Sequence, residues 1–373
     1  MENREVVFMK NRDYSKITKK SELIGHAACI LPKLWQQSRS LSNISRLRWS
    51  LAGKANMYYR EKLDEVPNWE GEDLSGKKIL IHFGFSGIGD VFFFSRFLAD
   101  SRFKEADVTF FCTPITSGLM REQTHIIKEV VEEPYIVRQA EGDDNSPWVI
   151  RFPEEDFKSF IDDIDFSIYD YKSDILKLAY DLEVDAEKID KSPHIFVKGE
   201  SDVQVDASKL NVGICWGGNQ FHHRDKLRSA PREKIESLFE NKKTNFYSLQ
   251  IKDNEGLEKY DNVFVSEFKD FTATAQLIKK LDLIISVDTA VLNLAGAMGK
   301  PVWLITQKAD PIHNKIDFRW TCTDKGINTW FKNAKAIGLE KNWDETIEEV
   351  SEELVKLIIN RISLGLQTDS VTH

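Results

Sequence analysis

The chain has 373 residues, of which 41% are hydrophobic and 30% are charged, and its formal net charge at pH 7 is −9. This length leaves room for two domains with their own cores, and the composition is typical of a soluble globular protein. Because no apolar run approaches about twenty residues and the first residues lack the basic-then-apolar order of a signal peptide, we expect neither a transmembrane helix nor a signal peptide. The four cysteines lie far apart without zinc or redox spacing, which favours buried thiols and a cytoplasmic location.

Positive charge is concentrated at the start of the chain. Residues 1–62 contain 13 Lys and Arg against 5 Asp and Glu, a balance of +8, so the remaining residues balance to −17. Apolar and aromatic residues between 31 and 63 recur at the spacing of one or two amphipathic helices. Such a segment fits peripheral binding at the inner face of the membrane or self-association, and it also fits packing on the domain that follows. We therefore predict a basic helical extension over residues 1–75, and the acidic remainder argues against a nucleic-acid partner.

Strands and helices alternate from residue 76 onward. The apolar run 78–83 predicts a buried strand, followed by the glycine-rich turn 84–90 and a helix over 91–100. The pattern then predicts strands over 107–112, 135–138 and 164–169, and helices over 115–131 and 174–182. This alternation indicates a parallel sheet with helices on both faces, in a first domain of residues 76–200.

The alternation restarts after a segment that is typical of a linker, residues 192–207. It predicts strands over 210–216, 245–250, 263–265, 283–287 and 302–305, and helices over 231–240, 272–281, 290–298 and 343–362. A polar loop is expected over 217–230 and a long connection over 306–342. We therefore predict two Rossmann-like domains in series, the second over residues 201–342, and a closing helix and tail over residues 343–373.

Glycines follow the first predicted strand at Gly84, Gly87 and Gly89. Glycines at such a turn let backbone approach a pyrophosphate, which suggests a dehydrogenase. The spacing is one residue short of the cofactor turn of the short-chain dehydrogenases. The Tyr58…Lys62 pair lies upstream of the turn, and no acidic residue closes the second strand, and both features argue against a dehydrogenase.

Two acidic residues stand where a predicted strand passes into a helix. Asp90 follows the glycine turn, where it either caps the helix or acts as a general base that takes a proton from an acceptor hydroxyl. Asp288 and Thr289 lie between the strand 283–287 and the helix 290–298. Free backbone N–H groups and the helix dipole favour an anion there, and the alternative is that Asp288 merely caps the helix.

A second glycine turn, Gly217-Gly218-Asn219, precedes the cations Lys226 and Arg228. The glycines would let a diphosphate approach, and the cations would neutralise charge on a leaving group. The alternative is an exposed basic loop. Because carboxyl ends of parallel strands share one edge of a sheet, we expect this loop and Asp288 to converge there.

Several segments resemble the heptosyltransferases, glycosyltransferase family nine. In the first domain these are residues 77–81 and Gly87-Ile88-Gly89-Asp90-Val91. In the second domain they are residues 286–290 and 294–303. Residues 212–219, 228–229, 248–250, 270–275, 317–320 and 329–331 are similar to a subgroup often fused to tetratricopeptide repeats. The resemblance covers about residues 77–360 and is thinner between 113 and 206.

The resemblance implies a GT-B fold, in which two Rossmann-like domains face each other across a cleft. It also implies an inverting, metal-independent glycosyltransferase that moves a sugar from a nucleotide-diphospho-sugar, by default ADP-heptose, to an acceptor hydroxyl. No cofactor is expected beyond this co-substrate. The acceptor stays open among a glycan, a lipid-linked sugar and a protein.

The resemblance also assigns residues to roles. Asp90 matches the general base. The acceptor-side loop comprises Ser86, Gly87 and Gly89. The residues expected to bind the donor are Gly217, Gly218, Lys226, Arg228, Gln250, Phe271, Asp288, Thr289, Ala290 and Asn293.

Two of these positions depart from the family. Asn293 stands where the family usually has histidine, and Ala290 stands where the classical heptosyltransferases have glycine. Because asparagine cannot supply a cationic donor, the first departure puts donor choice and activity in question. The alternative function is therefore a non-catalytic, GT-B-like protein that binds a nucleotide sugar or serves in assembly.

Overall fold

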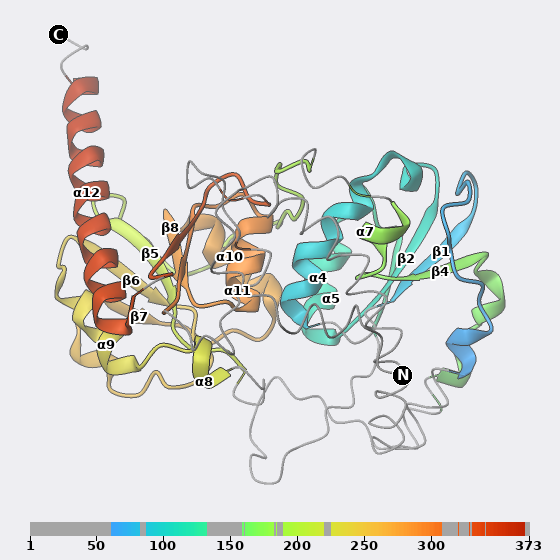
Figure 1. Cartoon of the computed structure of the whole chain (residues 1–373), viewed down its shortest axis with the longest axis horizontal. Helices are drawn as coiled ribbons and strands as arrows, with labels where there is room; N and C mark the ends of the chain where they lie inside the picture. The colour runs from blue at the N-terminus through green and yellow to red at the C-terminus, as the bar shows by residue number, and fades with distance from the viewer. Residues whose placement is uncertain are drawn as a thin grey trace, which may run out of the picture.

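The computed structural model describes residues 61–82, 87–132, 161–182, 189–219, 225–307, 330–339 and 341–369, together with 159, 184, 320 and 328. Most of the predicted basic extension, the predicted strand over 135–138 and Ser86 lie outside the described residues. The described residues form two sheets side by side, each with its own helices (Figure 1). We call the first sheet with its helices the first lobe, and the second sheet with its helices the second lobe.

Within the described residues, the first sheet has four parallel strands in the order β3-β2-β1-β4. Its strands are β1 (Lys78–His82), β2 (Asp107–Cys112), β3 (Glu129–Glu132) and β4 (Tyr171–Asp174). Its helices are α4 (Ile88–Phe94), η2 (Ser95–Ala99), η3 (Ser101–Phe103), α5 (Pro114–Arg121), η4 (Phe166–Ile168) and α7 (Leu178–Asp181). The apolar runs of β1 and β2 are buried on both faces, as expected for central strands of a parallel sheet.

The second sheet, again counting described residues, has six parallel strands in the order β10-β9-β8-β5-β6-β7. Its strands are β5 (Leu210–Cys215), β6 (Thr244–Ser248), β7 (Val263–Val265), β8 (Leu283–Ser286), β9 (Val302–Ile305) and β10 (Ala334–Ile337). Its helices are α8 (Asp225–Arg228), α9 (Arg232–Glu236), η6 (Ser237–Glu240), η7 (Leu257–Lys259), α10 (Phe271–Lys280), α11 (Ala290–Ala297) and α12 (Trp343–Asp369). Strand order reverses beside β5 here and beside β1 in the first sheet, and ligands of such sheets bind at the carboxyl ends of the strands at these points.

Three strands differ from the sequence-based prediction because pairing with neighbouring strands outweighs local pattern. β3 occupies the end of the predicted helix 115–131, where Val130 and Val131 pair with β2. Residues 164–169 were expected to form a strand, but Asp165 accepts a hydrogen bond from the Ser167 N–H and starts the turn of η4. The strand of this region is β4, and β10 lies within the segment predicted as a long connection.

Helix α4 begins earlier than predicted. It was expected over 91–100, but it starts at Ile88 directly after Gly87 and passes into the 3-10 helix η2 at Ser95. Asp90 therefore lies in the first helical turn and not ahead of the helix. Likewise the helix predicted over 174–182 is reduced to α7, because Asp174 ends strand β4.

Part of the predicted extension packs on the first lobe. Trp69 is fully buried, and its backbone N–H donates to the Lys172 carbonyl at 2.8 Å. The Lys172 N–H in turn donates to the Pro67 carbonyl at 2.7 Å, so this segment runs beside the edge strand β4. The domain boundaries drawn from the sequence stay predictions.

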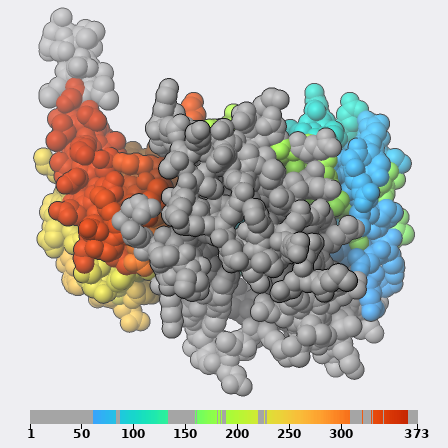
Figure 2. Space-filling model, in the orientation of Figure 1, coloured from blue at the N-terminus to red at the C-terminus, as the bar shows by residue number. Residues whose placement is uncertain are grey.

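Helix α12 covers the second lobe on the side away from the first lobe. Its buried residues recur at helical spacing and join one hydrophobic cluster with α9, η6 and β5: Trp343, Ile347, Val350, Leu354 and Ile358. Figure 2 shows α12 and the segment that begins at residue 61 at opposite ends of the visible face. None of the described helices combines the length and apolar composition that crossing a bilayer requires.

The lobes contact each other directly through their helices. In Figure 1, α4 and α5 of the first lobe face α10 and α11 of the second. Phe92 on α4 packs edge-on against Phe271 on α10, with ring centroids 5.0 Å apart. On α5, a Cβ at Gly118 would come within 2.7 Å of the Thr272 hydroxyl, so any larger residue there would force the Thr272 side chain to shift. One hydrophobic cluster therefore runs through both lobes; the predicted cleft stays a prediction.

A buried arginine of the first lobe, Arg96, contacts the segment that contains Trp330 and Phe331. Arg96 is 7% exposed, and its Nη1 donates to the Trp330 carbonyl at 2.8 Å. Its guanidinium carbon lies 4.5 Å from the ring centroid of Phe93 and 4.8 Å from that of Phe331, where the ring faces attract a cation. Burial lowers the pKa of Arg96 to about 9, and the charge of Asp190 opposes this, so the group stays cationic at neutral pH.

A buried histidine bridges the two lobes beside this arginine. The Nε2 of His194 lies 2.9 Å from the Phe92 carbonyl oxygen on α4, and its backbone N–H donates to the Ala297 carbonyl on α11 at 2.9 Å. Burial, followed by the charge of Arg96, lowers the pKa of His194 from 6.5 to about 3. The ring is therefore neutral over most of the acidic range.

This histidine predicts a loss of stability in acid. Between pH 6.5 and about 3, the unfolded chain binds a proton at His194 that the folded chain rejects. Stability from this group is intact above pH 6.5 and falls by up to about 1.4 kcal/mol for each pH unit below it. We expect His194→Gln to flatten the pH dependence of urea unfolding between about pH 6 and 4. The exposed His125, changed to Gln, serves as the control, and an equal flattening in both variants would contradict the assignment.

Candidate functional site

The candidate site begins in the first lobe at the turn between β1 and α4. Asp90 is the third residue of α4, and its Oδ2 accepts a hydrogen bond from the Gly87 N–H at 2.8 Å. This contact is the capping role that the sequence offered as one alternative. The carboxylate is only partly buried, and it stands at the carboxyl end of a central strand, where ligands of such sheets bind.

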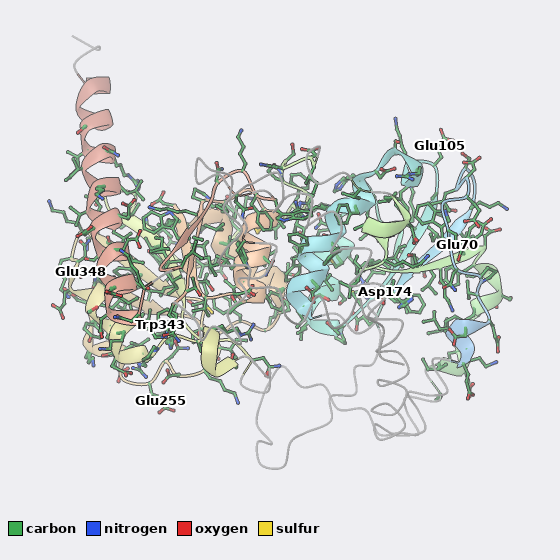
Figure 3. The ribbon with its side chains drawn as sticks, viewed as in Figure 1. Glu70, Glu105, Asp174, Glu255, Trp343 and Glu348 are labelled. Atoms are coloured by element: carbon green, nitrogen blue, oxygen red, sulfur yellow. The ribbon has the colours of Figure 1, made fainter. Side chains whose placement is uncertain are left out.

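Asp174 is a second carboxylate at this edge, and sequence patterns did not single it out. It ends β4 directly beside His82, the last residue of β1, and its Oδ1 accepts from the Leu176 N–H at 2.8 Å. In the view of Figure 3, Asp174 lies nearer the second lobe than Glu70 and Glu105 do.

The protonation of Asp174 is unusual for an aspartate. Burial raises the pKa of this carboxyl to about 7, and the Asp90 charge adds to the rise, while the Leu176 N–H and the Lys177 cation oppose it. A predicted strand that started at Tyr171 would have placed Asp174 at its carboxyl end. The sequence pattern instead assigned Asp174 to a helix over 174–182, so its position at a strand end was missed.

In the second lobe, the turn after β5 is held by side chains from two other segments. The Gly217 N–H donates to the Gln250 Oε1 at 3.0 Å, and the Gly218 N–H donates to the Ser229 Oγ at 3.1 Å. The thiol of Cys215 also donates to the Gln250 Oε1, at 3.3 Å. Gln250 is 9% exposed, so in this structure its amide mainly shapes the turn.

Arg228 joins this turn to the turn after β8. Its Nε pairs with the Asp225 Oδ1 at 3.1 Å, and its Nη1 donates to the Asp288 carbonyl at 2.7 Å. The guanidinium lies so close over Gly218 that a Cβ there would overlap it. The structure thus brings Gly218, Arg228 and Asp288 together at one edge of the second sheet, and their roles toward a ligand stay predictions.

Helix α11 is capped by Thr289. The Thr289 Oγ1 accepts from the Leu292 N–H at 3.4 Å and lies 2.9 Å from the Ser286 Oγ. The alternative that Asp288 caps this helix is therefore wrong, because a threonine in extended backbone occupies the cap position. The Asp288 carboxylate instead accepts from the Trp320 Nε1 at 2.9 Å.

The N-terminal turns of α4 and α11 meet at the contact between the lobes. A Cβ at Gly89 would lie 3.1 Å from the Asn293 Nδ2 and 3.4 Å from the Ala290 Cα. Asn293 is 1% exposed, and its Nδ2 donates to the Thr289 carbonyl at 2.9 Å. Its Oδ1 is buried and has no hydrogen-bond partner among the described residues. Gly89 of the predicted acceptor-side loop therefore lies close to Ala290 and Asn293, two of the residues predicted to bind the donor.

Of two further predicted donor residues, Phe271 is buried in the contact between the lobes, and the side chain of Lys226 is not described. Phe271 is 4% exposed and packs on Phe92 of the other lobe. Lys226 belongs to α8, and its side chain lies outside the described residues. Within the part of the chain that the structure describes, no group of three or more His, Cys, Asp or Glu side chains is placed to hold a metal ion.

Comparison with known proteins gives a distant sequence relative and a shared fold. No known protein-family profile matches the chain. The chain is similar to Protein FlbA of Caulobacter vibrioides, at 21% identity over 300 residues that cover 77% of this chain and 48% of that protein. The chain therefore spans about half the length of this curated relative.

Solved structures are similar along most of the chain. A glycosyltransferase of family nine from Veillonella parvula is 12% identical with a TM-score of 0.51, and the match covers 78% of this chain and 100% of that one. The Escherichia coli heptosyltransferase WaaC with ADP is 13% identical with a TM-score of 0.43, over 76% of this chain and 99% of that one. The first of these likenesses shows that the chain has the two-sheet fold of a family-nine glycosyltransferase. The resemblance inferred from the sequence is confirmed at the level of the fold.

Proposed function

We propose that the protein is a glycosyltransferase that moves a sugar from a nucleotide-diphospho-sugar to an acceptor hydroxyl. The observation that carries this proposal is the meeting of two helix N-termini on a family-nine fold: the turn with Asp90 and the turn at Thr289 beside Arg228. Transfer of a sugar from a nucleotide diphosphate needs a base for the acceptor hydroxyl and positive charge for the departing diphosphate. The carboxylate on one lobe could supply the first, and the cation and helix N-terminus on the other lobe could supply the second.

In the proposed reaction, Asp90 removes the proton of the acceptor hydroxyl as its oxygen attacks the anomeric carbon. The bond from that carbon to the nucleotide diphosphate breaks on the opposite face, so the configuration inverts. The departing diphosphate carries the released negative charge, which Arg228, Lys226 and the N-terminus of α11 stabilise. The proposed reaction uses no metal ion, and ADP-heptose is the first donor to test.

A second candidate is a non-catalytic protein that binds a nucleotide sugar. Two observations favour it: Asp90 already accepts a hydrogen bond from Gly87, and the buried Asn293 touches Gly89 and not an open surface. A protein of this kind would bind the donor and neither hydrolyse nor transfer it. The acceptor, a cytoplasmic location and peripheral membrane binding or self-association through residues 1–62 also belong to the proposal.

The proposed donor site predicts how two substitutions combine. Screening ADP-, UDP-, GDP- and CMP-sugars by thermal shift identifies the donor, and calorimetry then measures its Kd. We expect Arg228→Ala to weaken binding by about 10- to 100-fold, because a charge-assisted hydrogen bond to phosphate contributes about 1.5–3 kcal/mol. Gly218→Ala should act in the same direction, since its Cβ would displace the guanidinium.

The double variant distinguishes this site from general damage. Because Gly218→Ala acts through Arg228, the double variant should bind no more weakly than Arg228→Ala alone. Arg232 is the matched control: it is 20% exposed against 22% for Arg228, and it pairs with Glu236 and Asp253. Arg232→Ala should leave the Kd within about twofold. No binding of any nucleotide sugar by the intact protein would contradict the proposed function, and additive losses in the double variant would contradict the proposed phosphate contact.

A further inference from the structure

Helix α12 carries an apolar stripe on the side that does not pack on the second lobe. Val355, Ile359 and Ile362 are each about half exposed, and their spacing of four and three residues places them on one face of the helix. Ile358 on the packed face is buried, so α12 is apolar on two sides over this stretch. Figure 1 shows the C-terminal part of α12 extending past the strands of the second lobe. The stripe therefore stays open to solvent.

Acidic residues precede the stripe on the same side of α12. Glu348 and Glu352 are exposed, and they lie seven and three residues before Val355, at helical spacing. In Figure 3, Glu348 lies at the side of α12 that faces away from the strands. Among the ion pairs of the described residues, none includes Glu348 or Glu352. We call Glu348, Glu352, Val355, Ile359 and Ile362 the α12 face.

The segment 31–60 has the complementary chemistry. Leu34, Leu41, Ile44 and Leu51 recur at spacings of seven and three residues, so the sequence predicts an amphipathic helix there. The segment has no Asp or Glu, and it has six cations: Lys33, Arg39, Arg46, Arg48, Lys54 and Arg60. A basic amphipathic helix fits a helix face that combines apolar and acidic residues.

The described residue that follows this segment lies far from α12 in the same chain. Residue 61 begins the part of the first lobe that Figure 2 shows at the opposite end of the visible face from α12. Lys172 fixes this end, because its Nζ donates to the Leu63 carbonyl at 2.5 Å and pairs with the Asp64 carboxylate at 3.0 Å. Two copies that lie side by side in opposite directions bring each segment 31–60 toward the α12 face of the other copy.

This inference rests on the proposed self-association through residues 1–62 and not on sugar transfer: we propose that residues 31–60 of one copy dock on the α12 face of a second copy. The apolar residues of the segment cover the apolar stripe of α12, and its cations lie against Glu348 and Glu352. Each copy gives one segment and receives one, so the assembly closes as a symmetric dimer. Burial of the stripe drives the association, and the opposite charges fix its orientation.

The mass of the full chain in solution tests this dimer. Sedimentation equilibrium should give a mass that rises from one chain to two with concentration, and the dimer should weaken at high salt because its charges are exposed. Val355→Lys should weaken the dimer by at least about tenfold, since it places a cation in the apolar contact and repels the basic segment.

Val265→Lys is the matched control for this variant. Val265 is also 46% exposed, the same as Val355, but it ends strand β7 and does not belong to the α12 face. Its dimer should keep the natural Kd within about twofold. A natural chain that stays a monomer, or equal losses in the two variants, overturns the proposal.

Mixing two variants tests whether the exchange is reciprocal. Arg46→Glu/Arg48→Glu alters the segment and leaves the α12 face natural, whereas Val355→Lys does the opposite. In a mixed dimer, one of the two contacts joins a natural segment to a natural α12 face. Resonance energy transfer between labelled variants should therefore show a mixed dimer at least about tenfold tighter than either variant alone. No gain on mixing overturns the proposal.

Membrane binding is the competing use of residues 31–60. Vesicles with about one-third phosphatidylserine present an anionic surface to which basic amphipathic helices bind. A full chain that stays monomeric and binds these vesicles as tightly as Val355→Lys does would make the segment a membrane-binding element and overturn the proposal. Donor binding and transfer are measured separately, so failure of the proposed transferase function leaves the outcome for the dimer unchanged.

Discussion

Replacing Asp90 with Asn is expected to lower the rate of sugar transfer by about 10²- to 10⁴-fold, the contribution of a general base. Asn keeps an oxygen that can accept from the Gly87 N–H, so the helix start should survive while the proton acceptor is lost. Nucleotide-sugar affinity should stay within about twofold, because the proposed donor contacts come from the other lobe. Steady-state transfer kinetics and calorimetry on the same preparation measure both quantities.

Asp100 provides the control for Asp90. It also accepts a hydrogen bond from a backbone N–H at the start of a helix, that of Arg102 in η3, at 3.0 Å. Asp100→Asn should therefore transfer sugar at nearly the natural rate. Full turnover in Asp90→Asn would mean that Asp90 is only a helix cap. Failure of the unaltered chain to transfer sugar would instead favour the non-catalytic alternative.

Arg96→Ala should cause the largest loss of stability, about 3–5 kcal/mol. The substitution removes the hydrogen bond from Arg96 to the Trp330 carbonyl and opens a space between Phe93 and Phe331. These contacts join the first lobe to the segment that precedes β10, between two strands of the second sheet. Urea unfolding, followed by both fluorescence and circular dichroism, tests whether the two lobes then lose structure together.

Arg121 is the matched control for Arg96. Its side chain is 49% exposed and pairs with Glu132 at 2.8 Å, an arrangement that contributes about 1 kcal/mol or less. Arg121→Ala should therefore shift the unfolding midpoint only slightly. Equal losses in the two variants would show that the buried position of Arg96 adds nothing to the contact between the lobes.

Local pattern predicted the strands with apolar cores and the edge strand β7, and it failed for the edge strands β3, β4 and β10. The runs that became β1, β2, β5 and β8 are apolar on both faces, so their own residues identify them. The run Glu129–Glu132 in β3 and the run Ala334–Ile337 in β10 are half-buried, and their strand form depends on a neighbour that the local sequence does not contain.

The sequence likewise identified some residues of the candidate site and missed others. Glycines and turn residues led to Gly89, Gly218, Arg228 and Thr289, because such turns require particular residue types wherever they occur. Patterns did not lead to Asp174, since its pKa depends on burial and on Asp90, which lies on another segment. The family resemblance placed Asn293 in the donor site, which stays a prediction; its side chain is buried beside Gly89.

The sequence by itself determined the two parallel sheets and the positions of the glycine turns and helix starts, because these depend on residues within one or two turns of each other. The tertiary structure alone decided which of these turns meet. Arg96 and Trp330 are 234 residues apart, and the contact of Gly89 with Asn293 joins two lobes. Contacts of this kind arise when separate apolar faces are buried together, and burial then sets the charge states of His194 and Asp174 that no local pattern encodes.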